Sequence, residues 1–185
     1  MSRWKQKRSV MRRYDLTAQM YDQRYCEEQE AKYKAALEGL TITQSSVLLD
    51  VGCGTGLFFS HVADKAEAVV GVDVSRGLLL QAKQRVRGYG NVFVVQADAD
   101  HLPFKQGFFS FVFAFTVLQN MPKPVETLKE IKQVASREAS VVVTGLKRAV
   151  DLAVLGEWLE HAGLLAVSLR DDDALQCHVV VAVQA

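Results

Sequence analysis

Three aspartates stand at the ends of three successive predicted strands, where an open α/β sheet binds its ligand. Asp50 belongs to the apolar run 47–51, Asp73 ends the following run, and Asp98 comes directly after the third. Ligands of such sheets lie at the carboxyl ends of the strands, where the chain order reverses. Carboxylates accept hydrogen bonds from hydroxyl and amino groups, and no lysine or arginine stands beside these three. The pattern therefore predicts a nucleoside ligand without phosphate groups.

A glycine-rich turn follows the first of these strands. Gly52, Gly54 and Gly56 alternate with Cys53 and Thr55, and glycine lets a ligand approach the main chain closely. A dinucleotide-binding loop has the spacing G-x-G-x-x-G, which seats a pyrophosphate on a helix N-terminus. Here the spacing is G-x-G-x-G and an acid precedes the turn, which suits a ligand that carries an ammonium group. The side chain of Cys53 is expected to fit the turn because it is small, not to act as a nucleophile.

The composition is that of a globular domain. The 185 residues are 49% hydrophobic and 23% charged, enough to bury a sizeable core in one domain. Three cysteines without a C-x-x-C pair predict neither a disulfide framework nor a zinc site, and no metal site is expected. No apolar stretch approaches the roughly 20 residues that span a bilayer, and no apolar run follows the basic start as in a secretory signal. We expect a cytoplasmic protein without membrane contact.

After residue 40, apolar runs alternate with segments of helical periodicity. Several runs lack a polar face, which predicts a mostly parallel sheet covered by helices on both sides. The last two strands are too close for a helical crossover, so they are expected to form an antiparallel hairpin at one edge. The expected strands are 47–51, 68–74, 91–97, 108–116, 140–144, 164–169 and 175–183, with helices at 57–63, after the N-cap Ser75, from Pro124 and at 152–161.

The first forty residues differ from the rest. Residues 1–13 carry six lysines and arginines and no acid, and residues 16–38 are predicted to form one helix. A basic arm can bind a polyanion such as RNA, or it can be a frayed, solvated terminus. The sequence leaves both open. The expected division is a basic arm and helical lid over 1–40, followed by one compact domain over 41–185.

Four segments together resemble the class I S-adenosylmethionine-dependent methyltransferases, in particular the small-molecule-type group related to the menaquinone and ubiquinone methyltransferases. The resemblance implies a Rossmann-like, doubly wound fold of seven strands, S-adenosyl-L-methionine as cofactor, and methyl transfer by in-line displacement. The segments are Tyr14-Asp15-x-x-Ala18-x-x-Tyr21-Asp22, the run from Leu49 to Gly56, the run from Gly71 to Ser75, and the run from Ala97 to Phe104.

The resemblance also implies roles for individual residues. Gly52 and Gly54 pack against the methionine moiety, Asp73 accepts the ribose hydroxyls, and Asp98 with the Ala99 N–H contacts the adenine. The full set of cofactor-contacting residues expected in this way is Tyr21, Asp50, Gly52, Cys53, Gly54, Thr55, Gly56, Asp73, Val74, Asp98, Ala99, Phe115 and Thr116.

The acceptor side departs from the group. Where the group commonly has a Leu-His-His-Leu-like segment, this chain has Leu118-Gln119-Asn120-Met121, so no histidine base is offered. We therefore expect an acceptor that is already nucleophilic or is activated by Gln119 or Asn120. Tyr14 and Tyr21 lie seven residues apart, two turns of a continuous helix, and are candidates to close the cleft and contact the reacting groups. The catalytic residues are otherwise unassigned.

The sequence does not identify the acceptor. The resemblance favours a small molecule, whereas the basic arm and the short stretch between the fifth strand and the next helix favour RNA or a protein, because the usual substrate-covering insertion is missing there. A partner protein that completes the pocket, or a cofactor-binding subunit without activity, are the remaining alternatives. A nicotinamide-dependent oxidoreductase is disfavoured by the glycine spacing.

Overall fold

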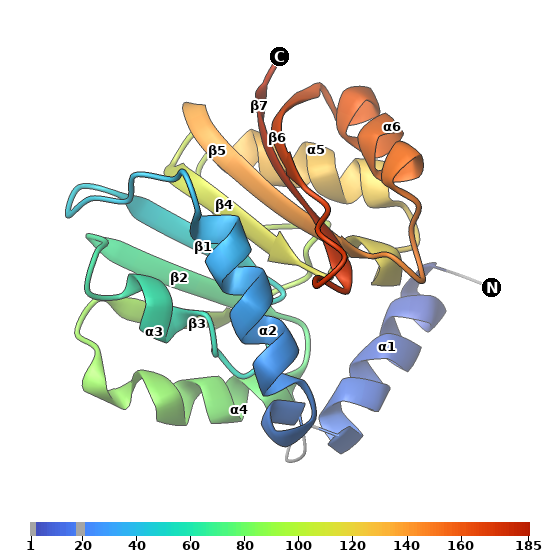
Figure 1. Cartoon of the computed structure of the whole chain (residues 1–185). Coiled ribbons are helices and arrows are strands. Elements are labelled where there is room, and N and C mark those ends of the chain that lie inside the picture. Colours follow the sequence, from blue (N-terminus) through green and yellow to red (C-terminus); the bar gives the residue numbers. More distant parts are fainter. Residues whose placement is uncertain (1–2, 18–20) are drawn as a thin grey trace.

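The computed structural model describes residues 3–17 and 21–185, and the side chains of 4–15 and 28–185 (Figure 1). Its centre is a seven-stranded sheet in the order β3-β2-β1-β4-β5-β7-β6. The strands are β1 (Val47–Val51), β2 (Ala68–Asp73), β3 (Val92–Gln96), β4 (Phe109–Phe115), β5 (Ala135–Leu146), β6 (Leu164–Arg170) and β7 (Cys177–Gln184).

The strand directions confirm the predicted fold class. The five strands from β3 to β5 are parallel, and β7 is antiparallel to both of its neighbours, β5 and β6. The order reverses at β1, which has β2 on one side and β4 on the other. A reversal of this kind leaves a crevice at the carboxyl ends of the strands. The predicted doubly wound sheet with an antiparallel edge hairpin is thus present.

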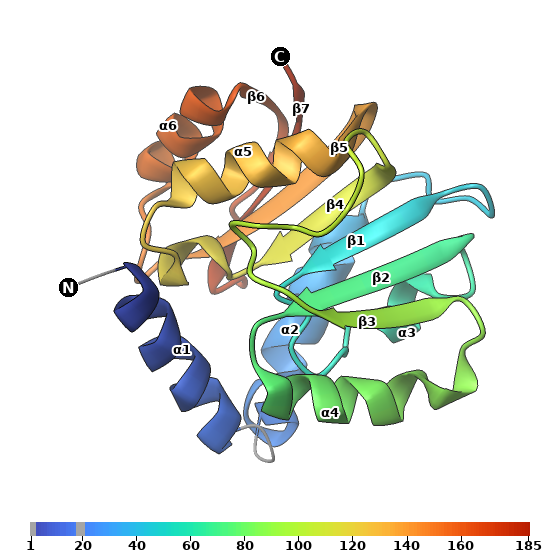
Figure 2. The same ribbon diagram turned by 180° about the vertical axis from the view of Figure 1, so that it is seen from behind.

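Helices cover both faces of the sheet (Figures 1 and 2). One core lies under α2, α3 and α4 and includes Tyr33, Phe59 and Leu79. The other lies under α5 and α6 and includes Ile131 and Leu159. The bounds are α2 (Tyr21–Leu37), α3 (Phe59–Val62), α4 (Arg76–Arg85), α5 (Pro124–Val134) and α6 (Leu152–Ala162), with short 3₁₀ turns η2 (Val86–Gly88) and η3 (Leu118–Asn120).

Local signals in the sequence fix several of these helix ends. Ser75 caps α4 by accepting a hydrogen bond from Leu78 N, Pro124 occupies the first turn of α5, and Gly163 ends α6 in a left-handed conformation with φ 75°. Other boundaries differ from the prediction. β5 is much longer than the predicted 140–144 and follows α5 without a loop. The prediction missed its start because the charged residues around Arg137 and Glu138 hide the strand pattern there.

The N-terminal region is not one helix over 16–38. It forms α1 (Arg3–Thr17) and then α2, so the alternative of a frayed terminus for residues 1–13 does not hold for residues 3–13, which are helical. No glycine or proline interrupts residues 3–17, and α1 is tied to α4, because Asp15 Oδ1 accepts hydrogen bonds from Ser75 Oγ at 2.6 Å and Gly77 N at 2.9 Å. In the described residues, no helix has both the length and the apolar character needed to cross a lipid bilayer.

Candidate functional site

A cavity lies at the carboxyl ends of the central strands and is lined in part by α1. Figure 2 shows α1 alongside this edge of the sheet. We call this cavity the cleft cavity; its empty space is about 760 Å³. α1 forms its outer wall with one face, and the ends of β2 and β4, the segments after β1 to β4, η3 and the start of α4 form the rest. Its lining residues are Lys7, Val10, Tyr14, Gly52, Gly54, Val72, Asp73, Val74, Leu78, Ala97, Asp98, Ala99, Phe115, Thr116, Val117, Asn120 and Met121.

The glycine turn is held tightly against β2. The N–H groups of Gly52 and Cys53 donate to Val72 O at 2.7 and 2.9 Å. Gly52 has φ 74°, and a Cβ there would lie 2.5 Å from Val117 Cγ2, so this position requires glycine. Gly56 also has a positive φ, and a Cβ on it would meet the ring of Phe59 at 2.4 Å. Its role is therefore to let the turn pack on Phe59, and it does not line the cleft cavity.

Asp73 is fixed by the backbone around it. Its Oδ2 accepts from Gly54 N at 3.0 Å, and its Oδ1 accepts from Ser75 N at 2.8 Å. Burial raises the pKa of Asp73, and these backbone hydrogen bonds oppose the rise. Each carboxylate oxygen has a second lone pair, so a ligand in the cleft can still donate to both.

Asp50 lies behind the glycine turn in a second, smaller cavity, the inner cavity, whose empty space is about 290 Å³. Asp50 is 2% exposed, and its Oδ1 has no hydrogen-bond partner among the described residues. Burial, and then the charge of Asp73, raise the pKa of Asp50 to about 8. The lining residues are Gln29, Tyr33, Asp50, Gly52, Cys53, Gly54, Thr55, Leu57 and Phe115.

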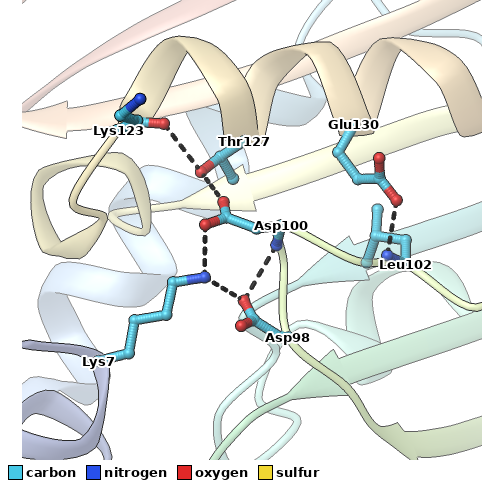
Figure 3. Close-up of polar contacts among 7 residues, drawn as sticks. All are labelled: Lys7, Asp98, Asp100, Leu102, Lys123, Thr127 and Glu130. Carbon is cyan, nitrogen blue, oxygen red and sulfur yellow. Dashed lines mark hydrogen bonds and ion pairs between the residues drawn. The ribbon is translucent and has the colours of Figure 1, made fainter. Parts of the chain in front are cut away.

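A lysine from α1 reaches the acids that follow β3 (Figure 3). Lys7 Nζ lies 2.6 Å from Asp98 Oδ1 and also pairs with Asp100, and the Lys7 side chain is only 9% exposed. Thr127 donates to the other oxygen of Asp100, and Asp100 N donates to Asp98 Oδ1 at 3.0 Å. The carboxylate expected to contact adenine is therefore also the anchor of α1.

The end of β4 carries an unusual backbone conformation. Thr116 has φ 56°, a left-handed value that is uncommon for a residue other than glycine and costs about 1–3 kcal/mol. Its N–H donates to Thr144 Oγ1 at 2.8 Å, and its carbonyl accepts from Asn120 Nδ2 at 3.1 Å. These bonds from β5 and η3 hold the strained residue at the mouth of the cleft.

A third cavity, the outer cavity, adjoins the cleft cavity and has about 1660 Å³ of empty space. The two share Tyr14, Thr116, Asn120 and Met121, which we call the junction. The other lining residues of the outer cavity are Arg13, Glu28, Gln29, Lys32, Leu118, Gln119, Pro124, Leu146, Arg148, Ala149, Val150 and Trp158.

Three of the four residues proposed for the acceptor side meet near the junction. Asn120 Oδ1 accepts from Arg13 Nη2 at 3.3 Å, and Asn120 Nδ2 lies 3.5 Å from Tyr14 Oη. Gln119 lines the outer cavity, and its buried Oε1 has no partner in the described part of the chain. The side chain of Tyr21 lies outside the described residues. Tyr14 and Tyr21 do not share one continuous helix as expected, because Tyr14 belongs to α1 and Tyr21 to α2.

The structure adds site residues that the sequence analysis missed. Lys7 and Val10 reach the cleft on the same face of α1 as Tyr14, at helical spacings of three and four residues. Gln29 and Tyr33 of α2 close the inner cavity. The spacing on α1 was a readable signal, but it was hidden by the interpretation of 1–13 as an arm. Nothing in the sequence placed α2 against the glycine turn.

Burial excludes one chemical role. Cys53 lines the inner cavity, and burial together with the nearby Asp50 and Asp73 raises the pKa of its thiol well above its usual range. Since the thiolate is the reactive form of cysteine, Cys53 is not a nucleophile here. This agrees with the expectation that its small size explains its place in the turn.

The model of the methyltransferase domain family matches residues 49–143, about half of the chain. The match includes the glycine turn and the three aspartates: Asp50 near the end of β1, Asp73 at the end of β2 and Asp98 after β3. The chain belongs to this family. The resemblance drawn from the sequence motifs is thereby confirmed.

Curated relatives of the methyltransferase-domain chain share less than a third of their residues with it. The malonyl-[acyl-carrier protein] O-methyltransferase of a Marinomonas species is 28% identical over 144 residues, which cover 77% of this chain and 53% of the relative. The demethylmenaquinone methyltransferase of Staphylococcus saprophyticus is 29% identical over 119 residues, which cover 63% of this chain and 51% of the relative. The chain thus spans about half the length of these relatives.

Solved structures share the fold at low sequence identity. The [4+2]-cyclase SpnF matches with a TM-score of 0.83 and 18% identity, covering 95% of this chain and 94% of that one. A chain from the complex between the Haloferax volcanii Trm112 methyltransferase activator and a putative methyltransferase matches with a TM-score of 0.81 and 16% identity, covering 94% and 96%. One of these neighbours is named as a cyclase, so the fold alone does not decide the reaction.

Proposed function

We propose that this methyltransferase-domain chain binds S-adenosyl-L-methionine and transfers its methyl group to a small molecule. The observation that carries the proposal is Asp50, a fully buried carboxyl with an unpartnered oxygen in the inner cavity. A buried polar atom of this kind costs free energy unless a partner satisfies it. The ammonium group of the cofactor's methionine moiety is such a partner, and its positive charge would favour the ionised form of Asp50.

The rest of the cofactor fits the adjoining space. The inner and cleft cavities share Gly52, Gly54 and Phe115, so a ligand can extend from Asp50 past the glycine turn to Asp73. The oriented oxygens of Asp73 suit the two ribose hydroxyls, and the loop that carries Asp98 and Ala99 suits the adenine. The remaining expected contacts, Cys53, Thr55, Val74 and Thr116, also line these cavities, and all of these assignments are part of the proposal.

The chain's contribution to the reaction is chiefly positioning. When bound, the cofactor supplies an electrophilic methyl group on a sulfonium. The junction residues Thr116 and Asn120 and the ring of Tyr14 border the place where an acceptor from the outer cavity would meet it. Holding two reactants at attack distance can lower a barrier by about 7–11 kcal/mol. A base is needed only when the attacking atom carries a tightly held proton.

The relatives' names support a small-molecule acceptor. The demethylmenaquinone methyltransferase is named for a quinone, and the Marinomonas enzyme for a malonyl group on its carrier protein. Their acceptors are not transferred to this chain, because it spans only about half of each. Labelled S-adenosylmethionine supplied with fractionated cell extract tests transfer directly. Label in a fraction that resists both RNase and protease supports the proposal, and label that RNase or protease removes contradicts it.

Cofactor binding has its own test. Calorimetry should show that the chain binds S-adenosylmethionine and its demethylated product and not NAD. Asp73→Ala removes the acceptor of two ribose hydroxyls, and a hydrogen bond to a charged group contributes about 1.5–3 kcal/mol. We expect the affinity to fall by one to two orders of magnitude. An unchanged affinity would exclude Asp73 from the ribose site.

One observation favours RNA as a second candidate acceptor. Lys5, Arg8 and Arg12 lie on the exposed face of α1, three and four residues apart, opposite the face that lines the cleft. Such a stripe can contact phosphates along a strand. A protein partner that completes the pocket is also possible for a chain of this fold, since one fold neighbour was solved with a methyltransferase activator. RNase-sensitive label in the extract assay would favour the RNA candidate.

A further inference from the structure

We propose that the outer cavity binds the anionic group of an amphipathic small molecule, a carboxylate or phosphate ester with an apolar body, through Lys32 together with Arg13 and Arg148. The inference rests on the proposed function, because it names the class of acceptor that the junction would present to the methyl group. It concerns how the acceptor is held and not which of its atoms is methylated.

Lys32 is the main observation. Its side chain is 1% exposed although it lines the outer cavity, and lysines are almost never fully buried unless they are paired. Its ammonium has three N–H donors, whereas the described contacts are one long ion pair with Glu28 at 3.6 Å and one hydrogen bond to Gln29 at 3.3 Å. Burial lowers the pKa of Lys32, which Glu28 and Cys177 only partly offset. An anion in the cavity would compensate this ammonium.

The charges around the cavity favour the same ligand. Three cations from three separate segments line it: Arg13 from α1, Lys32 from α2 and Arg148 from the connection between β5 and α6. Among the described lining residues, Glu28 is the one acid. The cavity therefore has an excess of positive charge, which would attract an anion and oppose a cation.

Apolar side chains form a large part of the remaining wall, beside polar residues such as Gln119 and Asn120. Leu118, Met121, Pro124, Val150 and Trp158 line the same cavity. A ligand that only carried charge would leave this surface in contact with water, whereas an apolar body would cover it at about 25 cal/mol per Å². Because Met121 also lines the cleft cavity, a molecule seated here would extend to the junction.

Trp158 gives a direct readout of binding. The chain has two tryptophans, and the other, Trp4, is exposed on α1. In a Trp4→Phe background, the fluorescence of Trp158 can be titrated with octanoate, octyl phosphate, octanol and octylamine. We expect octanoate and octyl phosphate to bind at least about tenfold more tightly than octanol and octylamine, the difference that one charged hydrogen bond provides.

Substitutions test the cations individually. Lys32→Met keeps the length and apolar stem of the side chain, and Arg148→Gln changes an exposed residue that cannot unfold the core. Both substitutions should lower the affinity for octanoate by about tenfold and leave the affinity for octanol unchanged. Lys83→Met, which removes an exposed lysine of α4 away from the cavity, should have no effect. Equal affinity for octanoate and octanol, or octanoate binding unaffected by both substitutions, would overturn the proposal.

Two further measurements separate this inference from its alternatives. A twelve-nucleotide oligouridylate and octyl phosphate are compared as competitors of octanoate. If the oligonucleotide displaces octanoate at the lower concentration of phosphate groups, the ligand is a polynucleotide and the small-molecule ligand is refuted. Calorimetric titration of S-adenosylmethionine into the same variants tests the proposed function separately. Loss of cofactor binding in the parent chain contradicts that function, whereas intact cofactor binding with no preference for anions contradicts only the inference about the outer cavity.

Discussion

At the scale of single residues, Asp50 combines two opposing demands. Its carboxyl is buried in the inner cavity, where its pKa rises to about 8 because burial disfavours the charge and Asp73 lies near. Without a ligand, the neutral form is therefore favoured near pH 7. A cationic group in the cavity would reverse that preference. The residue thus carries a cost in the free protein that a ligand can relieve, which is the usual sign of a functional position.

The raised pKa of Asp50 predicts how stability depends on pH. Between about pH 4 and pH 8 the unfolded carboxyl is ionised while the folded one keeps its proton. The unfolded state then binds fewer protons, so the free energy of unfolding falls as pH rises through this range and levels off above it. The raised pKa of Asp73 acts in the same direction. In the Asp50→Asn variant, the free energy of unfolding should fall less steeply with rising pH, as measured by urea denaturation at pH 5, 6.5 and 8.

The same substitution separates structure from function. If Asp50 holds the cofactor's ammonium, Asp50→Asn should lower the affinity for S-adenosylmethionine by about tenfold or more at pH 8, although it stabilises the free protein there. A merely structural carboxyl would show the change in stability alone. Calorimetry and denaturation on one preparation measure both quantities, and a gain in stability with unaltered cofactor affinity would remove Asp50 from the site.

The glycine turn makes a second prediction at this scale. Gly52→Ala places a Cβ 2.5 Å from Val117 Cγ2 at a residue with φ 74°. Overpacking of this kind costs about 1–3 kcal/mol of stability, and the displaced turn should also lower the affinity for the cofactor. Gly88→Ala is the matched control, because nothing lies within 4 Å of the added atom. Thermal denaturation compares the two, and equal melting temperatures would show that the turn accommodates a side chain.

At the scale of elements, α1 acts as the outer wall of the cleft. It is attached at both ends of its inner face, by Lys7 to the loop after β3 and by Asp15 to the start of α4. Between these attachments, Val10 and Tyr14 line the cavity. The opposite face is exposed and basic. That this helix covers a bound ligand, as proposed for the N-terminal lid over 1–40, stays a prediction.

Lys7 should control how long a ligand stays in the cleft. Lys7→Met leaves Asp98 and Asp100 without their shared cation, so α1 should detach more often. We expect faster hydrogen exchange in α1 and cofactor dissociation about tenfold faster in stopped-flow measurements. Arg8→Met, the exposed neighbour on the outer face, should leave both unchanged. Identical dissociation rates for the two variants would mean that α1 does not cover the cofactor.

Most elements were predictable, and the exceptions have physical causes. Apolar runs and caps located every strand of the sheet and the starts of α4 and α5, because these signals are local. The start of β5 was missed, since its charged residues around Arg137 depart from the strand pattern. α1 was missed as a helix because its basic outer face dominates its composition. Its stabilising contacts, those of Lys7 and Asp15, join residues 60 or more positions apart.

At the scale of the whole molecule, the site combines the strand ends of the sheet with elements that lie far from them in the sequence. The sequence pattern located the acids at the carboxyl ends of β1 and β2 and after β3, because strand ends of a parallel sheet share one edge. It did not locate the outer cavity, whose walls come from α1, α2, η3, the start of α5, the segment after β5 and α6. Nor did it associate Lys32 with the site, since a buried lysine on a polar helix has no distinctive pattern. Such a cavity depends on how distant elements pack.

This packing also determines which part of the chain can be removed. The expected division into a lid over 1–40 and a compact domain over 41–185 implies that a chain starting at Thr41 folds, but α2 contributes to the core. Tyr33 packs on Phe58 and Phe115 with ring centroids 5.1 and 4.8 Å apart, and Ala36 is fully buried. Removing residues 1–40 would expose this core and the inner cavity. We therefore expect the shorter chain to lose cooperative unfolding, as measured by circular dichroism on heating.

A chain that starts at Tyr21 removes α1 alone and should behave differently. The side chains of α1 line the cleft but belong to neither core cluster in the described structure, so this chain should unfold cooperatively with nearly the melting temperature of the full chain. Without Lys7, Val10 and Tyr14 it should bind S-adenosylmethionine at least about tenfold more weakly and lose turnover, because one wall of the cleft and part of the junction are absent. Calorimetry and the extract assay test this pair of outcomes. Full turnover in the folded, shortened chain would show that α1 does not close the active site and that a partner protein covers the bound ligand instead.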